Sequence, residues 1–440
     1  MATRKSAFKA VQAVTVNIWG MDVGAVALDP DTGYYAFEYE PRFVRSGMEL
    51  SPLQMPLAQA NAPFVFPNLP IATYQRLPAM LADALPDRFG NALINAWMAE
   101  RGIAPGNVTA LDRLAYMGQR SMGALTFKPS RGPQSSAATA VQMSQLVAQA
   151  RSVISGDFAG SDHASELLRQ IIQVGTSAGG ARAKATIAWS RSTQEVRTGQ
   201  FEIPEGYEAW LLKFDGIGLD SQLGPGRNYG RIEYAYSLMA GAAGVTMSDC
   251  RLLEEGGRAH FMTQRFDRDG NARHHMQTLC GMAHLDFNQQ ESHSYHQLFQ
   301  TLRQLQLDET AYAQTLRRMV FNVLAANNDD HTKNFSFLLR QGGPWELAPA
   351  YDVTYAYDPG NVWLRQHLMS VNGKFARITR EDLRAVANTY QLRGVCDAII
   401  DQAQAAIARW PEFAAQAGLP DEVRDQIAAT HREMAGHLAA

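Results

Sequence analysis

The segment Asn328-Asp329-Asp330-His331-Thr332-Lys333-Asn334 decides the fold class that we expect for this chain of 440 residues. It follows an apolar stretch with helical spacing, Met319 to Ala326, and it leads into an apolar strand, Phe335 to Leu339. A further aspartate, Asp352, comes after that strand in Pro349-Ala350-Tyr351-Asp352-Val353. The pattern therefore predicts two adjacent loops, one on each side of a strand hairpin, and each loop carries acidic or amide oxygens.

These residues are the groups that transfer of a phosphoryl group requires. The reaction needs a carboxylate near the attacking hydroxyl and oxygen ligands for Mg²⁺ on the phosphates. Asp329, Asn334 and Asp352 have the order and spacing of the protein-kinase catalytic loop and its metal-binding aspartate. Taken singly, each is more often a helix cap or a turn former. The combination predicts a nucleotide-dependent kinase.

A lysine upstream completes the pattern. Lys213 ends the apolar run Trp210-Leu211-Leu212, where a strand lysine would reach the α- and β-phosphates, although a lone lysine at a strand end is more often only solvated. Glu233 lies on the next predicted helix and is a candidate partner, and Glu208 and Asp215 are also near in sequence.

Two further segments each have a functional and a purely structural interpretation. Val174 to Lys184 is rich in glycine and ends with Arg182 and Lys184, so its backbone could approach phosphates closely, but such a run is more often a turn. It has neither the GxxxxGK[ST] spacing of a Walker loop nor the GxGxxG of ordinary protein kinases. Gln264 to Asp267 could connect two lobes and offer backbone groups and Phe266 to adenine, or it could be a salt-bridged turn.

Three regions of the chain differ in their patterns of apolar and polar residues. Residues 1–130 combine strand-like alternation with helical periodicity, residues 131–265 alternate short strands with glycine-rich turns, and residues 266–440 are mainly helical. We therefore expect an α+β, two-lobed, protein-kinase-like fold. Its parts would be an N-terminal α+β subdomain (1–130), a strand-rich ATP-binding lobe with the phosphate loop (131–265), and an all-helical C-terminal lobe with the catalytic loop (266–440).

Composition excludes several other classes of protein. The formal net charge of −3 argues against a free-standing nucleic-acid binder. No apolar run approaches the roughly 18 residues of a membrane span, and Gln12, Thr15 and Asn17 interrupt the N-terminal stretch, so we expect no signal peptide and a cytoplasmic protein. The 3 cysteines lack CxxC spacing and predict buried thiols rather than a disulfide framework or a zinc site.

Taken together, the motifs resemble the HipA family of toxin kinases. The resemblance spans nearly the whole chain, and the block from Asp329 to Ser336 is its most specific part. The matching pieces are Ser177…Gly180…Lys184, Lys213, Arg265-Phe266-Asp267-Arg268, Asp329 to Ser336, Tyr351-Asp352 and, in the N-terminal region, Leu50 to Leu57, Leu85-Pro86-Asp87 and Met122 to Leu125.

This resemblance implies a serine/threonine-protein kinase that uses ATP and Mg²⁺ and arrests bacterial growth as the toxin of a toxin–antitoxin pair. By analogy Asp329 is the catalytic base, Lys213 binds the phosphates, and Asn334 and Asp352 hold Mg²⁺. The rest of the nucleotide site would be Gly179, Gly180, Ala181, Arg182, Ala183 and Lys184 over the phosphates, Gln264, Arg265 and Phe266 at adenine, and His331, Lys333, Asn334 and Tyr351.

The resemblance also implies regulation and partners. Ser177 matches the loop serine whose autophosphorylation silences members of the family. The known targets of the family include aminoacyl-tRNA synthetases, and its antitoxins are small helix-turn-helix DNA-binding proteins. We therefore expect a HipB-like antitoxin, a protein substrate, DNA contact mainly through the antitoxin, and no membrane.

The sequence departs from the family pattern at two positions. Gln264 stands where an acidic residue is common, and Ala183 replaces a proline often found before the loop lysine. Compared with ordinary protein kinases, Asp329 lacks the preceding His-Arg and Asp352 lacks the following Phe-Gly, so control by a phosphorylated activation loop is not expected. The alternatives are a small-molecule or lipid kinase, and a pseudokinase that acts only as a corepressor with its antitoxin.

Overall fold

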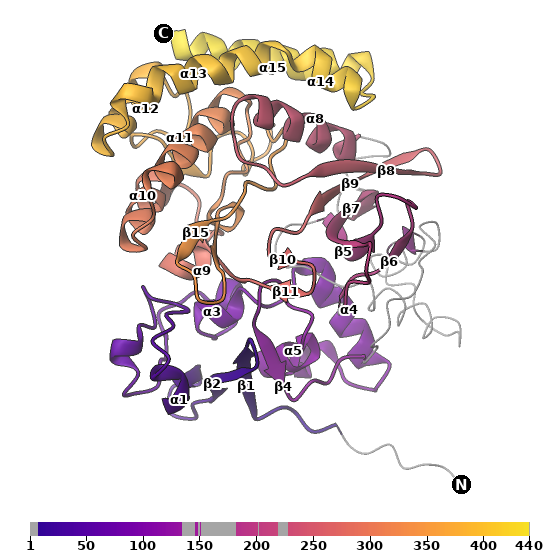
Figure 1. Cartoon of the computed structure of the whole chain (residues 1–440), viewed down its shortest axis with the longest axis vertical. Coiled ribbons are helices and arrows are strands. Elements are labelled where there is room, and N and C mark those ends of the chain that lie inside the picture. Colours follow the sequence, from indigo (N-terminus) through magenta and orange to yellow (C-terminus); the bar gives the residue numbers. More distant parts are fainter. Residues whose placement is uncertain are drawn as a thin grey trace.

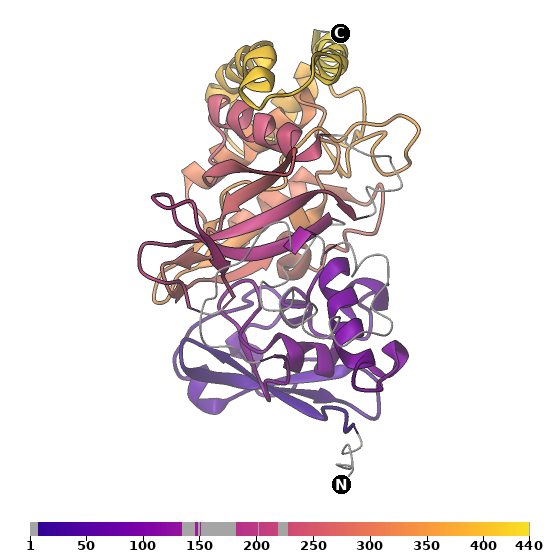
Figure 2. The ribbon, with the colours of Figure 1, turned by 90° about the vertical axis from the view of Figure 1, so that its right-hand side faces the viewer.

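Three groups of elements follow one another along the long axis of the molecule, from the N-terminus at one end to the last helices at the other (Figure 1, Figure 2). The computed structural model describes residues 8–133, 146–147, 150, 182–200, 202–218 and 228–439. Its strands and helices form the α+β fold that the sequence predicts. Within this described part, no helix combines the length and the apolar composition that a membrane span requires.

The N-terminal group is built on an antiparallel sheet in the order β3-β2-β1-β4. Val14, Val16 and Ile18 alternate along β1 and are completely buried. The last strand of the group pairs with the first, and Thr15 lies opposite Lys128, so the unit closes on itself. Its elements are β1 (Ala13–Ile18), β2 (Met21–Leu28), β3 (Tyr35–Tyr39), α1 (Pro41–Val44), α2 (Ile71–Tyr74), α3 (Ala79–Ala82), α4 (Arg88–Ala99), α5 (Ala110–Met117) and β4 (Thr126–Lys128).

The middle group is a five-stranded antiparallel sheet in the order β6-β5-β7-β9-β8, with helix α8 packed against it (Figure 1). Its register places Lys184 directly opposite Lys213, so both lysine side chains leave the same face of the sheet. The elements are β5 (Arg182–Trp189), β6 (Val196–Thr198), β7 (Glu208–Gly218), α8 (Tyr229–Ala242), β8 (Cys250–Glu255) and β9 (Arg258–Gln264).

The C-terminal group is mainly helical, but it is not all-helical as we expected. A three-stranded sheet, β12-β14-β15, lies beside the helices, because the apolar strand after the catalytic segment needs partners for its backbone. The elements are β10 (Arg268–Asp269), β11 (Ala272–Arg273), β12 (His275–Thr278), α9 (Leu279–Ala283), β13 (His293–Ser294), α10 (Tyr295–Gln304), α11 (Glu309–Leu324), β14 (Ser336–Leu339), β15 (Trp345–Leu347), β16 (Met369–Ser370), α12 (Arg380–Thr389), α13 (Arg393–Ala408), α14 (Trp410–Gln416) and α15 (Asp421–Ala439).

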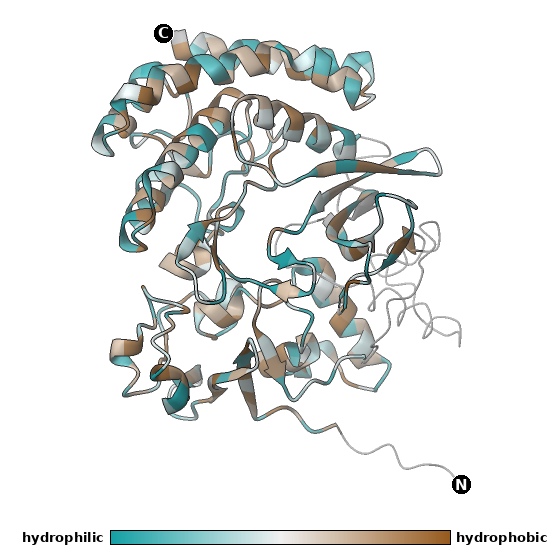
Figure 3. Cartoon of the chain, in the orientation of Figure 1, coloured by the Kyte–Doolittle hydropathy of each residue, from teal (hydrophilic) through white to brown (hydrophobic). Residues whose placement is uncertain are grey.

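A continuous apolar core joins the three groups. Buried side chains that contact one another extend from Val14 in β1 through Tyr236 in α8 to Ile427 in α15. Helices α12 to α15 each show hydrophobic and hydrophilic residues in Figure 3, as expected for helices that bury one face and expose the other. The active-site candidates described next lie where the three groups meet.

Candidate active site

The candidate catalytic segment, Asn328 to Asn334, follows soon after the end of α11 at Leu324. Asn328 donates its side-chain amide to the carbonyl oxygen of Leu364 at 2.9 Å, and Asn334 donates its own to the carbonyl oxygen of Asp329 at 2.7 Å. The loop is therefore closed on itself by a side chain. The side-chain NH₂ of Asn334 donates this bond, and its amide oxygen is the acceptor atom that could hold a metal ion.

The two neighbouring aspartates of this loop have opposite environments. The side chain of Asp329 is 46% exposed, and its Oδ1 lies 3.9 Å from Nε2 of His331. Asp330 is buried and accepts hydrogen bonds from the Tyr295 hydroxyl at 2.8 Å, the His367 ring at 3.0 Å and the Leu368 N–H at 2.8 Å. Asp329 is thus open to an incoming substrate, whereas Asp330 fixes the loop.

Lys213 lies between two carboxylates. Its Nζ is 2.5 Å from Oε1 of Glu233 on α8, and it also contacts Oδ1 of Asp352. Of the three candidate partners in the sequence, Glu233 is therefore the one that pairs with Lys213. Glu208 instead accepts from Arg191 at 2.8 Å, and the backbone N–H of Asp215 donates to the ring of His260.

Asp352 is held in the ionised form. Burial by itself raises the pKa of Asp352, but the ammonium groups of Lys213 and Lys184 lower it more, so the net shift is well below the ordinary value. Its backbone has a φ of 53°, a left-handed conformation that is rare for residues other than glycine. The surrounding structure therefore holds this carboxylate at a defined position beside both lysines.

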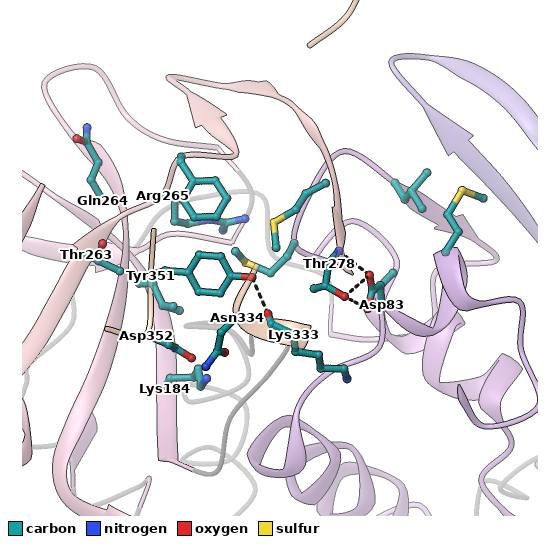
Figure 4. A pocket seen from close by; sticks show the side chains of 17 residues that line it. Asp83, Lys184, Thr263, Gln264, Arg265, Thr278, Lys333, Asn334, Tyr351 and Asp352 are labelled. Carbon is teal, nitrogen blue, oxygen red and sulfur yellow. Dashed lines mark hydrogen bonds between the residues drawn. The ribbon is translucent and has the colours of Figure 1, made fainter. Parts of the chain in front are cut away.

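A pocket lies between the N-terminal group and the other two groups. In Figure 4 the side chains of Asp352, Asn334 and Lys184 gather at one end of it. The rings of Phe266 and Tyr351 lie 5.6 Å apart with an angle of 37° between them, and the Tyr351 hydroxyl donates to the carbonyl oxygen of Lys333 at 2.6 Å. The lining combines this polar end with an apolar wall made by Met80, Ala84, Met122, Leu125, Leu211, Phe266 and Met276.

The connector after β9 fits both interpretations that the sequence left open. The guanidinium of Arg265 donates two hydrogen bonds to Asp267, at 2.9 and 2.8 Å, which is the salt-bridged turn. Asp267 also accepts from Arg268 and from the N–H of Gly123. Burial raises the pKa of Asp267, but the two arginines outweigh it and the carboxylate stays ionised. Phe266, between them in sequence, lines the pocket.

Two backbone N–H groups of this connector already donate hydrogen bonds within the protein. The N–H of Gln264 donates to the carbonyl oxygen of Asp249 at 2.8 Å, and the N–H of Arg265 donates to that of Ala209 at 2.9 Å. The side chain of Gln264 points away from Tyr351 and Asp352 in Figure 4. Any adenine bound here would therefore use backbone groups other than those two N–H groups.

Most of the expected site residues come together. Those that line the pocket are Lys184, Gln264, Arg265, Phe266, Lys333, Asn334, Tyr351 and Asp352. Lys213 adjoins them through Asp352, His331 lies beside Asp329, and Ala183 is buried in the core. Ser177, Gly179, Gly180 and Ala181 lie outside the described residues, as does the side chain of Arg182.

Two acidic residues of the N-terminal group were not recognised in the sequence as parts of a site. Asp83 lines the pocket and accepts from the N–H and hydroxyl of Thr278 at 2.8 and 2.9 Å. Asp87 lies 3.7 Å from Lys184. The sequence signal for Asp87 was the Leu85-Pro86-Asp87 motif, but no local pattern connects that motif to a strand that begins about a hundred residues later.

The fold and the site together define a class of protein. A five-stranded sheet with a helix against it carries a lysine–glutamate pair, and the next lobe carries an Asp-x-x-x-x-Asn loop and a second aspartate beyond a hairpin. This is the two-lobed architecture of protein kinases. The model of the HipA N-terminal domain matches residues 14–128, and that of the HipA-like C-terminal domain matches residues 176–433. The chain belongs to the HipA family.

One solved structure supports this fold. The chain is similar to HipA of Shewanella oneidensis MR-1, in a complex with HipB and operator DNA, with a TM-score of 0.64 and 18% identity over 97% of this chain and 96% of that chain. It is also similar to the proinflammatory kinase CtkA of Helicobacter pylori, with a TM-score of 0.36 and 13% identity over 52% of this chain and 88% of that chain, which is too weak to carry an argument. No curated protein matches the sequence.

Proposed function

We propose that this protein is a serine/threonine-protein kinase that transfers the γ-phosphate of ATP to a protein, and that it acts as the toxin of a toxin–antitoxin module. The observation that carries the proposal is that Asn334 and Asp352 line one end of the pocket, with Lys213 in contact with Asp352. The exposed Asp329 lies in the same loop as Asn334, whose side chain is bonded to the Asp329 backbone. Each of these groups has a counterpart in phosphoryl transfer by protein kinases.

The residues fit Mg²⁺ and the phosphates. The carboxylate of Asp352 and the amide oxygen of Asn334 would hold the metal, since Mg²⁺ prefers hard oxygen ligands and usually takes only one or two from the protein. Lys213, kept in place by Glu233, would contact the phosphates, and Lys184 leaves the same face of the sheet. Bound ATP would supply the phosphoryl group that is transferred, and Mg²⁺ would neutralise the charge that develops on that group.

The pocket also fits the adenine ring of ATP. Adenine is flat and aromatic, and the apolar wall offers the rings of Phe266 and Tyr351 together with three methionine side chains. Asp329 would accept the proton of the attacking hydroxyl, because it is the exposed carboxylate of the loop, whereas Asp330 is buried.

A protein is the substrate class that the surroundings of Asp329 favour. Val362 and Trp363 are 50% and 40% exposed, and they adjoin Leu364, whose carbonyl oxygen is bonded to Asn328 of the catalytic loop. Large exposed apolar side chains on a segment that is bonded to this loop suit a macromolecular partner better than a small metabolite. An aminoacyl-tRNA synthetase is a candidate substrate through family membership.

Partners and regulation are proposed on the same basis. A HipB-like helix-turn-helix antitoxin would bind this chain and supply most of the DNA contact, in line with the complex of the Shewanella protein with HipB and operator DNA. Gly179 to Lys184 would cover the phosphates, and Ser177 would be the site of silencing autophosphorylation. A pseudokinase corepressor and a small-molecule or lipid kinase are the alternatives.

The test of the proposal compares wild type with Asp352→Asn. Labelled γ-phosphate should pass from ATP to the protein fraction of a bacterial lysate, and induced expression of the chain should arrest growth. Loss of the metal-binding carboxylate should reduce labelling by at least about 10²-fold and abolish arrest. The matched control is Asp358→Asn, because Asp358 is exposed and accepts only a local hydrogen bond from the N–H of Gly360.

The outcomes separate the alternatives. Label found only in lipids or small molecules would favour the corresponding kinase. ATP binding without any labelling, by a chain that still represses with its antitoxin, would favour the pseudokinase. Full labelling and full growth arrest by Asp352→Asn would contradict the mechanism.

A further inference from the structure

Asp87 is a buried carboxylate from the N-terminal group that reaches the phosphate end of the pocket. It is the N-cap of α4, and its Oδ1 accepts a hydrogen bond from the N–H of Gly90 at 2.7 Å. Its Oδ2 is buried, makes no hydrogen bond and lies 3.7 Å from Nζ of Lys184 on β5. The side chains of Asp87 and Lys184 are only 1% and 4% exposed.

This geometry differs from that of an ordinary structural ion pair. The helix fixes the carboxylate by one oxygen, while the other oxygen attracts the lysine at a distance too long for a hydrogen bond. The ammonium of Lys184 is therefore held near the carboxylate by charge rather than by a hydrogen bond. A buried charge on a long side chain needs such a partner, since an isolated one is costly.

The position of Lys184 makes the contact relevant to the nucleotide. Lys184 lines the pocket, lies opposite Lys213 in the sheet, and is close enough to lower the pKa of Asp352. The site thus contains two lysine–carboxylate pairs. Lys213–Glu233 lies within the middle group, and Lys184–Asp87 joins it to the N-terminal group.

We infer that Asp87 is a positioning residue for the nucleotide phosphates: it holds Lys184 where the ammonium meets the triphosphate, so that the N-terminal subdomain contributes to phosphate binding. This inference rests on the proposed function. Asp87 touches Lys184 rather than the nucleotide, so it acts on the reaction through that lysine.

The test is calorimetric titration of the full chain with MgATP and, separately, with adenosine, in wild type and Asp87→Asn. Asparagine is as good an N-cap as aspartate, so the variant keeps the helix start and removes only the charge. The dissociation constant for MgATP should rise about tenfold, the usual scale for losing a close charge partner, whereas that for adenosine should change by less than about twofold. Lys184→Met should have the same effect, and the double variant should not be additive.

A second readout is the pH dependence of binding. Burial raises the pKa of Asp87 to about 6, although Lys184 opposes the rise. MgATP affinity of wild type should therefore fall toward that of Asp87→Asn as the pH drops from 7.5 to 5.5. The charged groups that face Asp87 among the described residues are Lys184 and, behind it, Asp352, Lys213 and Glu233.

The control variant is Asp112→Asn, which alters another buried carboxylate of the N-terminal group that bonds Thr109 and Val11 instead of a lysine. It should leave the ratio of MgATP to adenosine affinity unchanged. Equal weakening of both ligands in Asp87→Asn, or no weakening of MgATP, would overturn the inference. Failure of wild type itself to bind MgATP would overturn the proposed function instead.

Discussion

Lys213 shows how the buried charges at this site stabilise one another. Its buried ammonium contacts Glu233 and Asp352, and the latter carboxylate is also influenced by Lys184. Removing water from any one of these charges alone would cost several kcal/mol, so they are stable only as a set. The set keeps Asp352 ionised, as its proposed role as a metal ligand requires.

Asp87 leads to a prediction about stability at this same scale. A carboxyl whose pKa rises on folding, here to about 6 from 3.8, favours the folded state below pH 4 and loses that contribution as the pH rises through 6. Relative to wild type, Asp87→Asn should therefore gain about 1–3 kcal/mol in free energy of unfolding between pH 4 and pH 7. Urea denaturation at the two pH values measures this. A stability difference between the variant and wild type that does not shift in favour of the variant from pH 4 to pH 7 would contradict this prediction.

At the scale of elements, Asp330 joins the catalytic loop to two other segments. Its carboxylate accepts from Tyr295 at the start of α10 and from His367 and Leu368, which precede β16. Asn322 of α11 in turn donates to the Tyr295 hydroxyl at 3.0 Å. The loop that carries Asp329 is thus held from behind by a buried hydrogen-bonded network.

Asp330→Asn is expected to loosen this loop. The buried network loses its negative charge and one of its two acceptor oxygens, so the free energy of unfolding should fall by about 1–3 kcal/mol. We expect kcat to fall more than ATP affinity, because the pocket walls stay in place. Tyr295→Phe, which removes the hydroxyl that donates to Asp330 and accepts from Asn322, should cost about 1 kcal/mol. Urea denaturation and steady-state kinetics are the measurements. An unchanged kcat in Asp330→Asn would show that the network does not position Asp329.

The elements themselves were largely predictable, because they depend on local patterns. The helix expected to carry Glu233 is α8, and the apolar strand expected from Phe335 to Leu339 is β14 except for its first residue. Their pairing was not predictable. The Lys184–Lys213 register and the contact of Asp87 with Lys184 depend on residues far apart in sequence. The strand from Phe335 was expected, but its partner β12 was not, since four residues beside a turn carry little signal.

At the scale of the whole molecule, arginines attach the N-terminal group to the lobe connector. Arg273 donates to the carbonyl oxygens of Gln119 and Ser121 at 2.8 and 3.0 Å, and Asp267 accepts from the N–H of Gly123 at 2.7 Å. Gly123 has a φ of 74°, and a Cβ there would come within 3.1 Å of the Met276 nitrogen. This glycine therefore permits the close approach that forms the pocket wall.

We propose that the chain divides into three parts at about residues 130 and 265. The pocket draws residues from all three of them. Met122 and Asp83 come from the first, Lys184 and Gln264 from the second, and the catalytic segment from the third. The proposed catalytic unit is accordingly the entire chain. The sequence motifs that predicted a kinase of the HipA family are also spread along the chain, from the N-terminal region to Asp352.

The central claim is that Asp329 is the base of a phosphotransferase whose nucleotide site is built by other residues. The most direct measurement is γ-phosphate transfer to protein by purified wild type and Asp329→Asn, with MgATP binding measured on the same samples. We expect the variant to bind MgATP within about twofold of wild type, since Asn334 bonds the backbone of Asp329 rather than its side chain, and to transfer phosphate about 10²–10⁴-fold more slowly. Transfer by Asp329→Asn at the wild-type rate would contradict the account.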